Sequence, residues 1–122
     1  MSISSAESIV MQALWDRHPQ TAEDLVHGIG PAQDWQESTI KTLLTRLLAK
    51  QAICAEKDGR RFLYSPLVTR DDWVAEQSDS LLDRLFGGRV APLVAHFAEH
   101  RKLTPKDLAD LKKLIAEIDD GH

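Results

Sequence analysis

The sequence predicts a mainly α-helical protein with one small β-hairpin near its middle. Apolar residues recur with the 3.6-residue period of amphipathic helices on both sides of that hairpin. The hairpin is indicated by Asp58-Gly59, which lies between the strand-like residues 53–57 and 61–65. The 122 residues, of which 43% are hydrophobic and 28% charged, can form one domain or a small domain with an oligomerising extension. We favour the second organisation.

Two helices are expected in the first quarter of the chain. Ser4-Ser5-Ala6-Glu7 is a capping box, in which the Ser4 and Glu7 side chains each accept a hydrogen bond from the other residue's backbone amide. The first helix therefore starts there, and Pro19 blocks its continuation. Thr21-Ala22-Glu23-Asp24 is a second helix start. The stop signals that we expect for the second helix are Gly28, Gly30 and Pro31.

A third helix follows, with one apolar and one polar face. The apolar stripe consists of Ile40, Leu43, Leu44, Leu47 and Leu48. The polar face carries hydroxyls and cations without an acid: Ser38, Thr39, Lys41, Thr42, Thr45 and Arg46. Such a face suits a DNA major groove, because Lys and Arg reach phosphates or guanine edges and Thr offers a hydroxyl and a methyl to base edges. Taken alone, the face fits a solvated helix surface equally well.

The hairpin favours the DNA interpretation. Glycine tolerates the positive φ of a tight turn, so the chain is expected to turn at Asp58-Gly59, and Pro66 limits the second strand. Lys57, Arg60 and Arg61 would then gather at the tip, where they can contact a phosphate backbone beside the groove. The order helix, helix, helix, hairpin is that of a winged helix-turn-helix, in which the third helix enters the major groove. Residues 1–70 are therefore predicted to form a winged-helix DNA-binding domain.

The charge distribution supports a basic segment at this motif. The whole chain has a net charge of −4, yet residues 38–61 contain six Lys or Arg and two Asp or Glu. A local basic patch matters more for nucleic-acid binding than the average charge. The chain has no apolar run approaching the roughly 18 residues of a membrane span and no signal-peptide pattern at its start. We therefore expect a cytoplasmic protein without membrane insertion.

Residues 71–122 are predicted to form a helical dimerisation domain. Three amphipathic helices are expected, over residues 73–86, over residues 90–100, and from the cap Thr104 with Pro105 at the first helical position. Helices this short bury little surface alone, so we expect them to pack against a second copy and present two recognition helices to a pseudo-palindromic site. The residues assigned to dimerisation are Leu81, Leu82, Leu85, Phe86, Leu93, Val94, Phe97, Leu111, Leu114, Ile115 and Ile118.

No cofactor, metal or catalytic site is predicted. Cys54 is the only cysteine and is interpreted as a small strand residue. His96 and His100 have the i, i+4 spacing of zinc ligands, but no third ligand is evident. The chain lacks a phosphate-binding glycine loop and a nucleophile motif, so it is not expected to be an enzyme. Three tryptophans are interpreted as packing residues: Trp15, Trp35 and Trp73.

These residues together resemble the penicillinase-repressor family of BlaI/MecI/CopY-type transcriptional repressors. The resemblance covers nearly the whole chain and is carried by residues 3–7 with Val10-Met11 and Leu14-Trp15, by residues 39–47, by residues 62–68 and by residues 93–97. It implies a homodimer that represses genes, such as those for beta-lactam resistance, by binding double-stranded operators with TACA/TGTA-like half-sites.

The resemblance also implies a route of induction. In the beta-lactam branch, a membrane sensor with a metalloprotease domain leads to cleavage of the repressor in its dimerisation helices, commonly at an Asn-Phe bond. This chain has His96-Phe97 at the matching place, so the position is kept while its first residue differs. The copper branch carries a C-terminal cluster of cysteines, which this chain lacks.

Two local departures from the family pattern concern the ends of the third helix. Gln51 stands where the family often has glycine, and a left-handed cap without glycine costs about 1 kcal/mol. The family often has Ser or Thr before this helix, where the present chain has Gln36-Glu37-Ser38. Glu37 favours the positive end of the helix but could repel phosphate. Two other functions stay open: a winged-helix protein-interaction module that binds no DNA, and a metal-responsive repressor that uses His96 and His100.

Overall fold

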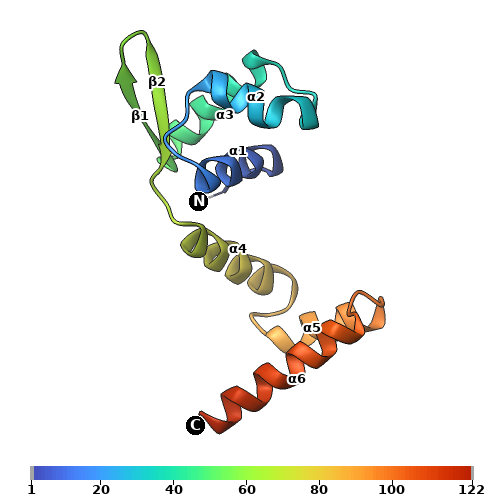
Figure 1. Ribbon diagram of the computed structural model, residues 1–122. Coiled ribbons are helices and arrows are strands. Elements are labelled where there is room, and N and C mark those ends of the chain that lie inside the picture. Colours follow the sequence, from blue (N-terminus) through green and yellow to red (C-terminus); the bar gives the residue numbers. More distant parts are fainter. Residues whose placement is uncertain (1, 122) are drawn as a thin grey trace. The chain divides into compact units, whose positions relative to one another are not determined.

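The computed structural model describes residues 2–121 and contains six helices and one two-stranded antiparallel sheet (Figure 1). The elements are α1 (Ser5–Asp16), α2 (Ala22–Gln33), α3 (Glu37–Ala49), β1 (Ile53–Asp58), β2 (Arg61–Pro66), α4 (Arg70–Leu85), α5 (Val90–Glu99) and α6 (Pro105–Asp120). The predicted mainly α fold with a β-hairpin is confirmed. The chain forms two compact units, Met1–Glu76 and Gln77–His122, so the boundary falls inside α4.

The core of the first unit lies where α1, α2 and α3 pack on one another and on the base of the hairpin. Its fully buried apolar residues are Val10, Met11, Leu14, Leu25, Ile40, Leu43, Leu44, Leu47, Ala52 and Ile53. The apolar stripe predicted for the third helix supplies four of these residues, which confirms its period. Burying one such side chain contributes roughly 1.5–3 kcal/mol, so this cluster is the main stabilising element of the unit.

Three helix starts follow the predicted capping chemistry. Ser4, Thr21 and Thr104 each accept a hydrogen bond from the backbone amide three residues later, and that later residue's carboxylate accepts one from the cap's own amide. Pro105 occupies the first turn of α6, as expected. Capping boxes pair amides that have no partner inside the helix, so these three starts are set by local sequence.

The predicted end of α2 is wrong, because the helix runs through Gly28, Gly30 and Pro31 to Gln33. A proline this close to the end of a helix removes only one backbone donor, which limits its disruptive effect. The helix ends instead at Asp34, whose φ is 56°. Gly30 has a packing role there, since a Cβ at this position would lie 3.0 Å from the Trp35 carbonyl oxygen.

The hairpin turns one residue later than predicted. Asp58 pairs with Arg61 as the last pair of the ladder, which leaves Gly59 and Arg60 as the two loop residues. Gly59 has a φ of 66°, so glycine supplies the conformation that a two-residue hairpin loop requires. At its other end β2 is tied to the helical body, because Tyr64 and Gln20 exchange backbone hydrogen bonds of 2.8 and 3.0 Å.

The tryptophans pack as the sequence predicts. The Trp15 and Trp73 rings lie 5.4 Å apart between centroids, and the Trp15 indole N–H donates a 2.9 Å hydrogen bond to the Val68 carbonyl. Trp35 is partly buried against the core. Trp73 belongs to the first turns of α4, which explains why the first compact unit extends to Glu76.

The end of α3 is a left-handed cap at Gln51, whose φ is 61°. The Ala52 amide donates to the Leu47 carbonyl and the Gln51 amide to the Leu48 carbonyl, both at 3.0 Å. This is the Schellman pattern, and the two residues whose apolar contact usually accompanies it, Leu47 and Ala52, are both fully buried in the same core cluster. The family-derived expectation of a left-handed position without glycine is confirmed.

Replacing Gln51 by glycine should stabilise the first unit by about 0.5–1 kcal/mol, because only glycine adopts a positive φ without a steric cost. Urea unfolding followed by tryptophan fluorescence measures the change. The matched control is Ala49→Gly, at an exposed helical position two residues earlier, which should destabilise by about 1 kcal/mol. Equal effects of the two substitutions would contradict this account of the cap.

Candidate nucleic-acid interface

The polar face of α3 is exposed over its whole length. Every α3 residue assigned to DNA binding is exposed: Ser38, Thr39, Lys41, Thr42, Thr45 and Arg46. The opposite face is held in the core by Ile40, Leu43, Leu44 and Leu47. The helix is therefore anchored by one side only, and the other side can meet a ligand without disturbing the core.

Two hydroxyls on this face are already engaged as donors. Thr42 Oγ1 donates to the Ser38 carbonyl and Thr45 Oγ1 to the Lys41 carbonyl, each at 2.9 Å. A hydroxyl has one hydrogen and two lone pairs, so both oxygens can still accept a hydrogen bond. In this conformation Thr42 and Thr45 suit contact with a base amino group better than with a base acceptor.

A hollow of about 200 Å³ separates α3 from the wing. It is lined by Thr21, Ala22, Glu23, Glu37, Lys41, Arg60, Arg61, Phe62 and Tyr64. The structure thus brings together Lys41 from the third helix and both arginines that the sequence assigned to the wing. It also places two carboxylates among them: Glu37, which the sequence indicated as a possible opponent of phosphate, and Glu23, which the sequence interpretation did not include.

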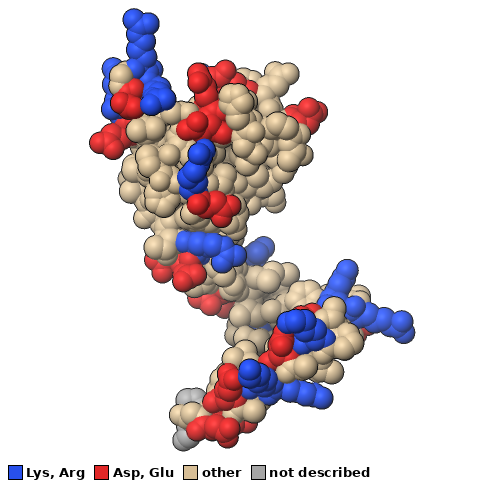
Figure 2. Space-filling model, in the orientation of Figure 1, with Lys and Arg blue, Asp and Glu red and all other residues tan. Residues whose placement is uncertain are grey.

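Two of these cations form ion pairs within the protein. Lys41 Nζ lies 3.0 Å from Glu37 Oε1, and Arg61 Nη2 lies 3.1 Å from Asp58 Oδ2. Figure 2 shows basic side chains at the tip of the wing with acidic ones beside them. Both pairs are exposed, so each contributes little to stability. In the part of the chain that the structure describes, Arg46 and Arg60 form no ion pair.

The second unit exposes the apolar residues assigned to dimerisation. None of residues 77–121 is buried. Five of the assigned residues are exposed, namely Leu85, Phe97, Leu114, Ile115 and Ile118, with fractions between 39% and 64%. The others are only partly buried: Leu81, Leu82, Phe86, Leu93, Val94 and Leu111. A row of half-exposed apolar side chains on a helix is typical of a surface that another chain covers.

The two histidines of α5 and its C-cap lie together. The rings of His96 and His100 are 4.2 Å apart between centroids, and His100 Nδ1 lies 2.9 Å from the His96 carbonyl oxygen. Among residues 2–121 there is no group of three or more His, Cys, Asp or Glu side chains placed to hold a metal ion. Cys54 is exposed on β1. No helix of the described chain is long and apolar enough to span a membrane.

The model of the penicillinase repressor family matches residues 3–117 of this chain. The chain belongs to the penicillinase repressor family. It is 30% identical over 115 residues to the penicillinase repressor of Bacillus licheniformis, an alignment that covers 94% of this chain and 90% of that protein. It is 32% identical over 113 residues to the methicillin resistance regulatory protein MecI of Mammaliicoccus sciuri, with coverage of 93% and 92%.

A solved structure of the same family matches the first unit. The monomeric form of Bacillus licheniformis BlaI in complex with the blaP half-operator is 32% identical, with a TM-score of 0.52, over 59% of this chain and 88% of that chain. The predicted winged-helix fold is confirmed by this likeness. The chain is a transcriptional repressor of this family and not an enzyme.

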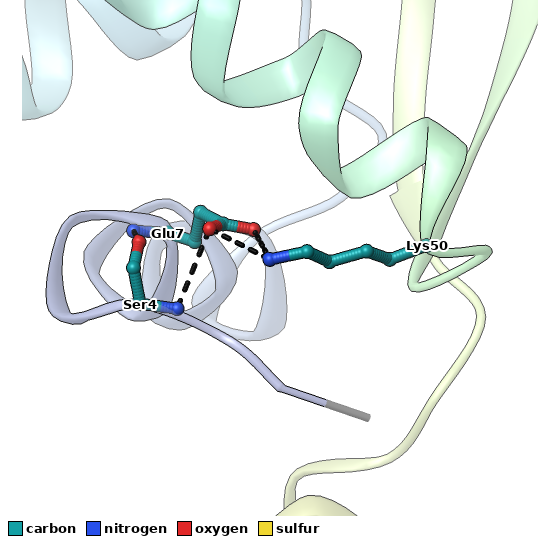
Figure 3. A network of polar contacts seen from close by, with 3 residues as sticks. All are labelled: Ser4, Glu7 and Lys50. Carbon is teal, nitrogen blue, oxygen red and sulfur yellow. Dashed lines mark hydrogen bonds and ion pairs between the residues drawn. The ribbon is translucent and has the colours of Figure 1, made fainter.

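An ion pair with a buried carboxylate links the C-terminal end of α3 to α1 (Figure 3). Lys50 Nζ lies 2.8 and 2.6 Å from the two carboxylate oxygens of Glu7, whose side chain is 3% exposed. The Ser4 backbone amide donates to the same carboxylate at 3.4 Å. Lys50 and Glu7 are 43 residues apart in sequence. No local sequence pattern predicts a contact at that separation, so the sequence did not indicate this pair.

The pair is charged because its attractions exceed the cost of burial. Burial by itself raises the pKa of the Glu7 carboxyl, but the hydrogen bonds from Lys50 and Ser4 and the charge of Lys50 outweigh it, so the pKa lies below its ordinary value of 4.5. A carboxyl with a lowered folded-state pKa stabilises the protein above its unfolded-state pKa. That contribution is lost as the pH falls through the folded-state pKa.

Glu7→Gln should therefore destabilise the first unit by about 1–3 kcal/mol at neutral pH, because it leaves Lys50 without its counter-charge while Lys50 stays partly solvated. The difference from the unmodified protein should shrink once the pH falls well below 4.5. Urea midpoints at pH 7 and near pH 3 measure it. The control Asp58→Asn removes an exposed pair and should cost at most about 1 kcal/mol. A destabilisation by Glu7→Gln that is independent of pH would refute the charged pair.

Proposed function

We propose that this repressor acts as a cytoplasmic homodimer that binds a palindromic operator with TACA/TGTA-type half-sites through α3 and the wing. The observation that carries the proposal is the exposed polar face of α3, which shares a hollow with the wing arginines. A helix of this kind fits the major groove, and cations on a neighbouring hairpin fit the adjoining phosphates. The structure of BlaI with its half-operator supports this arrangement for a relative of the first unit.

The residues have distinct expected roles in this interface. Thr39, Lys41, Thr42 and Arg46 meet bases or phosphates, and their neighbours Ser38 and Thr45 lie on the same exposed face. Arg60 and Arg61 contact the backbone, because a hairpin beside the groove reaches phosphates more readily than base edges. Backbone contacts position the protein, whereas those α3 side chains that reach bases select the sequence.

Dimerisation is supported by the apolar surface of α4, α5 and α6. The helices of the second unit bury no residue completely on their own, and exposed apolar surface is unfavourable in water. A second copy that covers the residues assigned to dimerisation removes this surface and gives a two-fold symmetric pair. Two linked recognition helices then bind two half-sites with a higher affinity than one helix binds one half-site.

We further propose that the repressor controls beta-lactam resistance or related genes and that cleavage at His96-Phe97 releases it, in a pathway that starts at a membrane metalloprotease sensor. The names of its relatives, a penicillinase repressor and a methicillin resistance regulatory protein, support the gene class. Both residues of the bond are exposed on α5. Cutting there separates α6 from the DNA-binding unit, which weakens the dimer and hence the operator complex.

Arg46→Ala should lower operator affinity by about 1–3 kcal/mol and relax the preference for one base pair if Arg46 reads a base, whereas Arg61→Ala should weaken all sequences alike and flatten the salt slope by about one unit. Fluorescence anisotropy with a TACA/TGTA palindrome and its point variants separates the two effects. Lys112→Ala, which removes an exposed cation from α6, is the charge control. Unchanged affinity in both arginine variants would refute the assignment.

Ile115→Asp should dissociate the dimer, because it places a charge on the apolar face of α6. Sedimentation velocity at micromolar concentration should show a shift from dimer to monomer, and palindrome affinity should fall while half-site affinity is kept. Ala116→Asp introduces the same charge at the next exposed residue, away from the apolar stripe, and should remain dimeric. A monomeric unmodified protein, or a dimeric Ile115→Asp variant, would contradict the proposed interface.

A further inference from the structure

The hollow between α3 and the wing holds nearly balanced charges. Lys41, Arg60 and Arg61 line it, and so do Glu23 and Glu37. All five residues are exposed, so their charges are available to a ligand as well as to one another. The cations of this hollow attract phosphate, whereas the carboxylates in the same hollow repel it.

Glu37 is the carboxylate with the most direct effect. It is the first residue of α3, where the positive end of the helix favours an acid, and it lies one turn before Lys41. Its carboxylate is 3.0 Å from Lys41 Nζ, with the two side chains 53% and 61% exposed. An i, i+4 pair in water is weak, so the ammonium group can exchange this carboxylate for a phosphate.

The wing shows the same arrangement with different residues. Asp58 holds Arg61 at 3.1 Å. The pKa of the Asp24 carboxyl on α2 lies below its usual range, mainly because the Thr21 backbone amide donates a hydrogen bond to it. The positive charge of Arg61 lowers this pKa further, so Arg61 also acts on α2. On α3 and on the wing alike, a cation that lines the hollow is therefore paired with a carboxylate of the protein itself.

We propose that Glu37 competes with DNA phosphate for Lys41 and thereby limits the affinity of this repressor for DNA of any sequence. The inference rests on the proposed DNA binding. A phosphate that approaches Lys41 competes with the Glu37 carboxylate for the ammonium group, and the carboxylate stays near the phosphate as a like charge. The resulting penalty does not depend on the bases, so it lowers the occupancy of the large excess of non-operator DNA.

The test compares the full chain with its Glu37→Gln variant on two labelled duplexes, a TACA/TGTA palindrome and a scrambled sequence of the same length. Glu37→Gln should bind both duplexes several-fold more tightly at 50 mM salt. Its advantage should shrink about threefold between 50 and 200 mM salt, because Lys41 without its carboxylate partner neutralises one phosphate fully, which adds up to about 0.9 to the salt slope. In a Lys41→Gln background the substitution should give no such gain.

The matched control is Glu117→Gln, an exposed residue of α6, which changes the net charge equally and should leave both affinities unaltered. Urea midpoints verify that each variant is folded. The proposal is overturned if Glu37→Gln binds like the unmodified protein, if its gain persists without Lys41, or if it changes only the preference at one base pair, since Glu37 would then read a base. Failure of the unmodified protein to bind either duplex would instead refute the proposed function itself.

Discussion

The first unit depends on the way α3 is held by one face only. Its apolar face supplies four residues to the core, and its polar face remains exposed. The C-terminal end is fixed twice, by the left-handed cap at Gln51 and by the ion pair of Lys50 with Glu7 of α1. All of these contacts lie on the buried face of α3 or at its C-terminal end, and none of them involves the polar face. The helix can therefore be oriented accurately while its exposed polar side chains stay available to a ligand.

The second unit has the opposite character, because its helices complete no core of their own. Residues 77–121 include no buried residue, while apolar side chains such as Leu114 and Ile118 are about half exposed. This exposed apolar surface supports the proposed association with a second copy, which would cover it. In the proposed dimer, DNA affinity is linked to dimerisation, and we expect that removal of α6 also reduces operator binding.

Local chemistry was predictable from the sequence and distant contacts were not. Caps such as Ser4 depend on residues three positions apart, so their geometry follows from sequence alone. The end of α2 was misjudged because Gly30, a stop signal by composition, instead serves the close approach of the Trp35 carbonyl. The basic face of α3 was predicted correctly, but its pairing with Glu37 needed the structure, as did the contact between Lys50 and α1.

In the proposed complex, α3 and the wing bind operator DNA, with phosphate contacts supplying much of the affinity and base contacts the selectivity. The most direct measurement is the affinity of the unmodified protein for a TACA/TGTA palindrome and for a scrambled duplex, titrated across a range of salt concentrations. We expect tighter binding to the palindrome and a steep loss of affinity for both duplexes as salt increases. No complex at micromolar dimer, or equal affinities for the two duplexes, would contradict it.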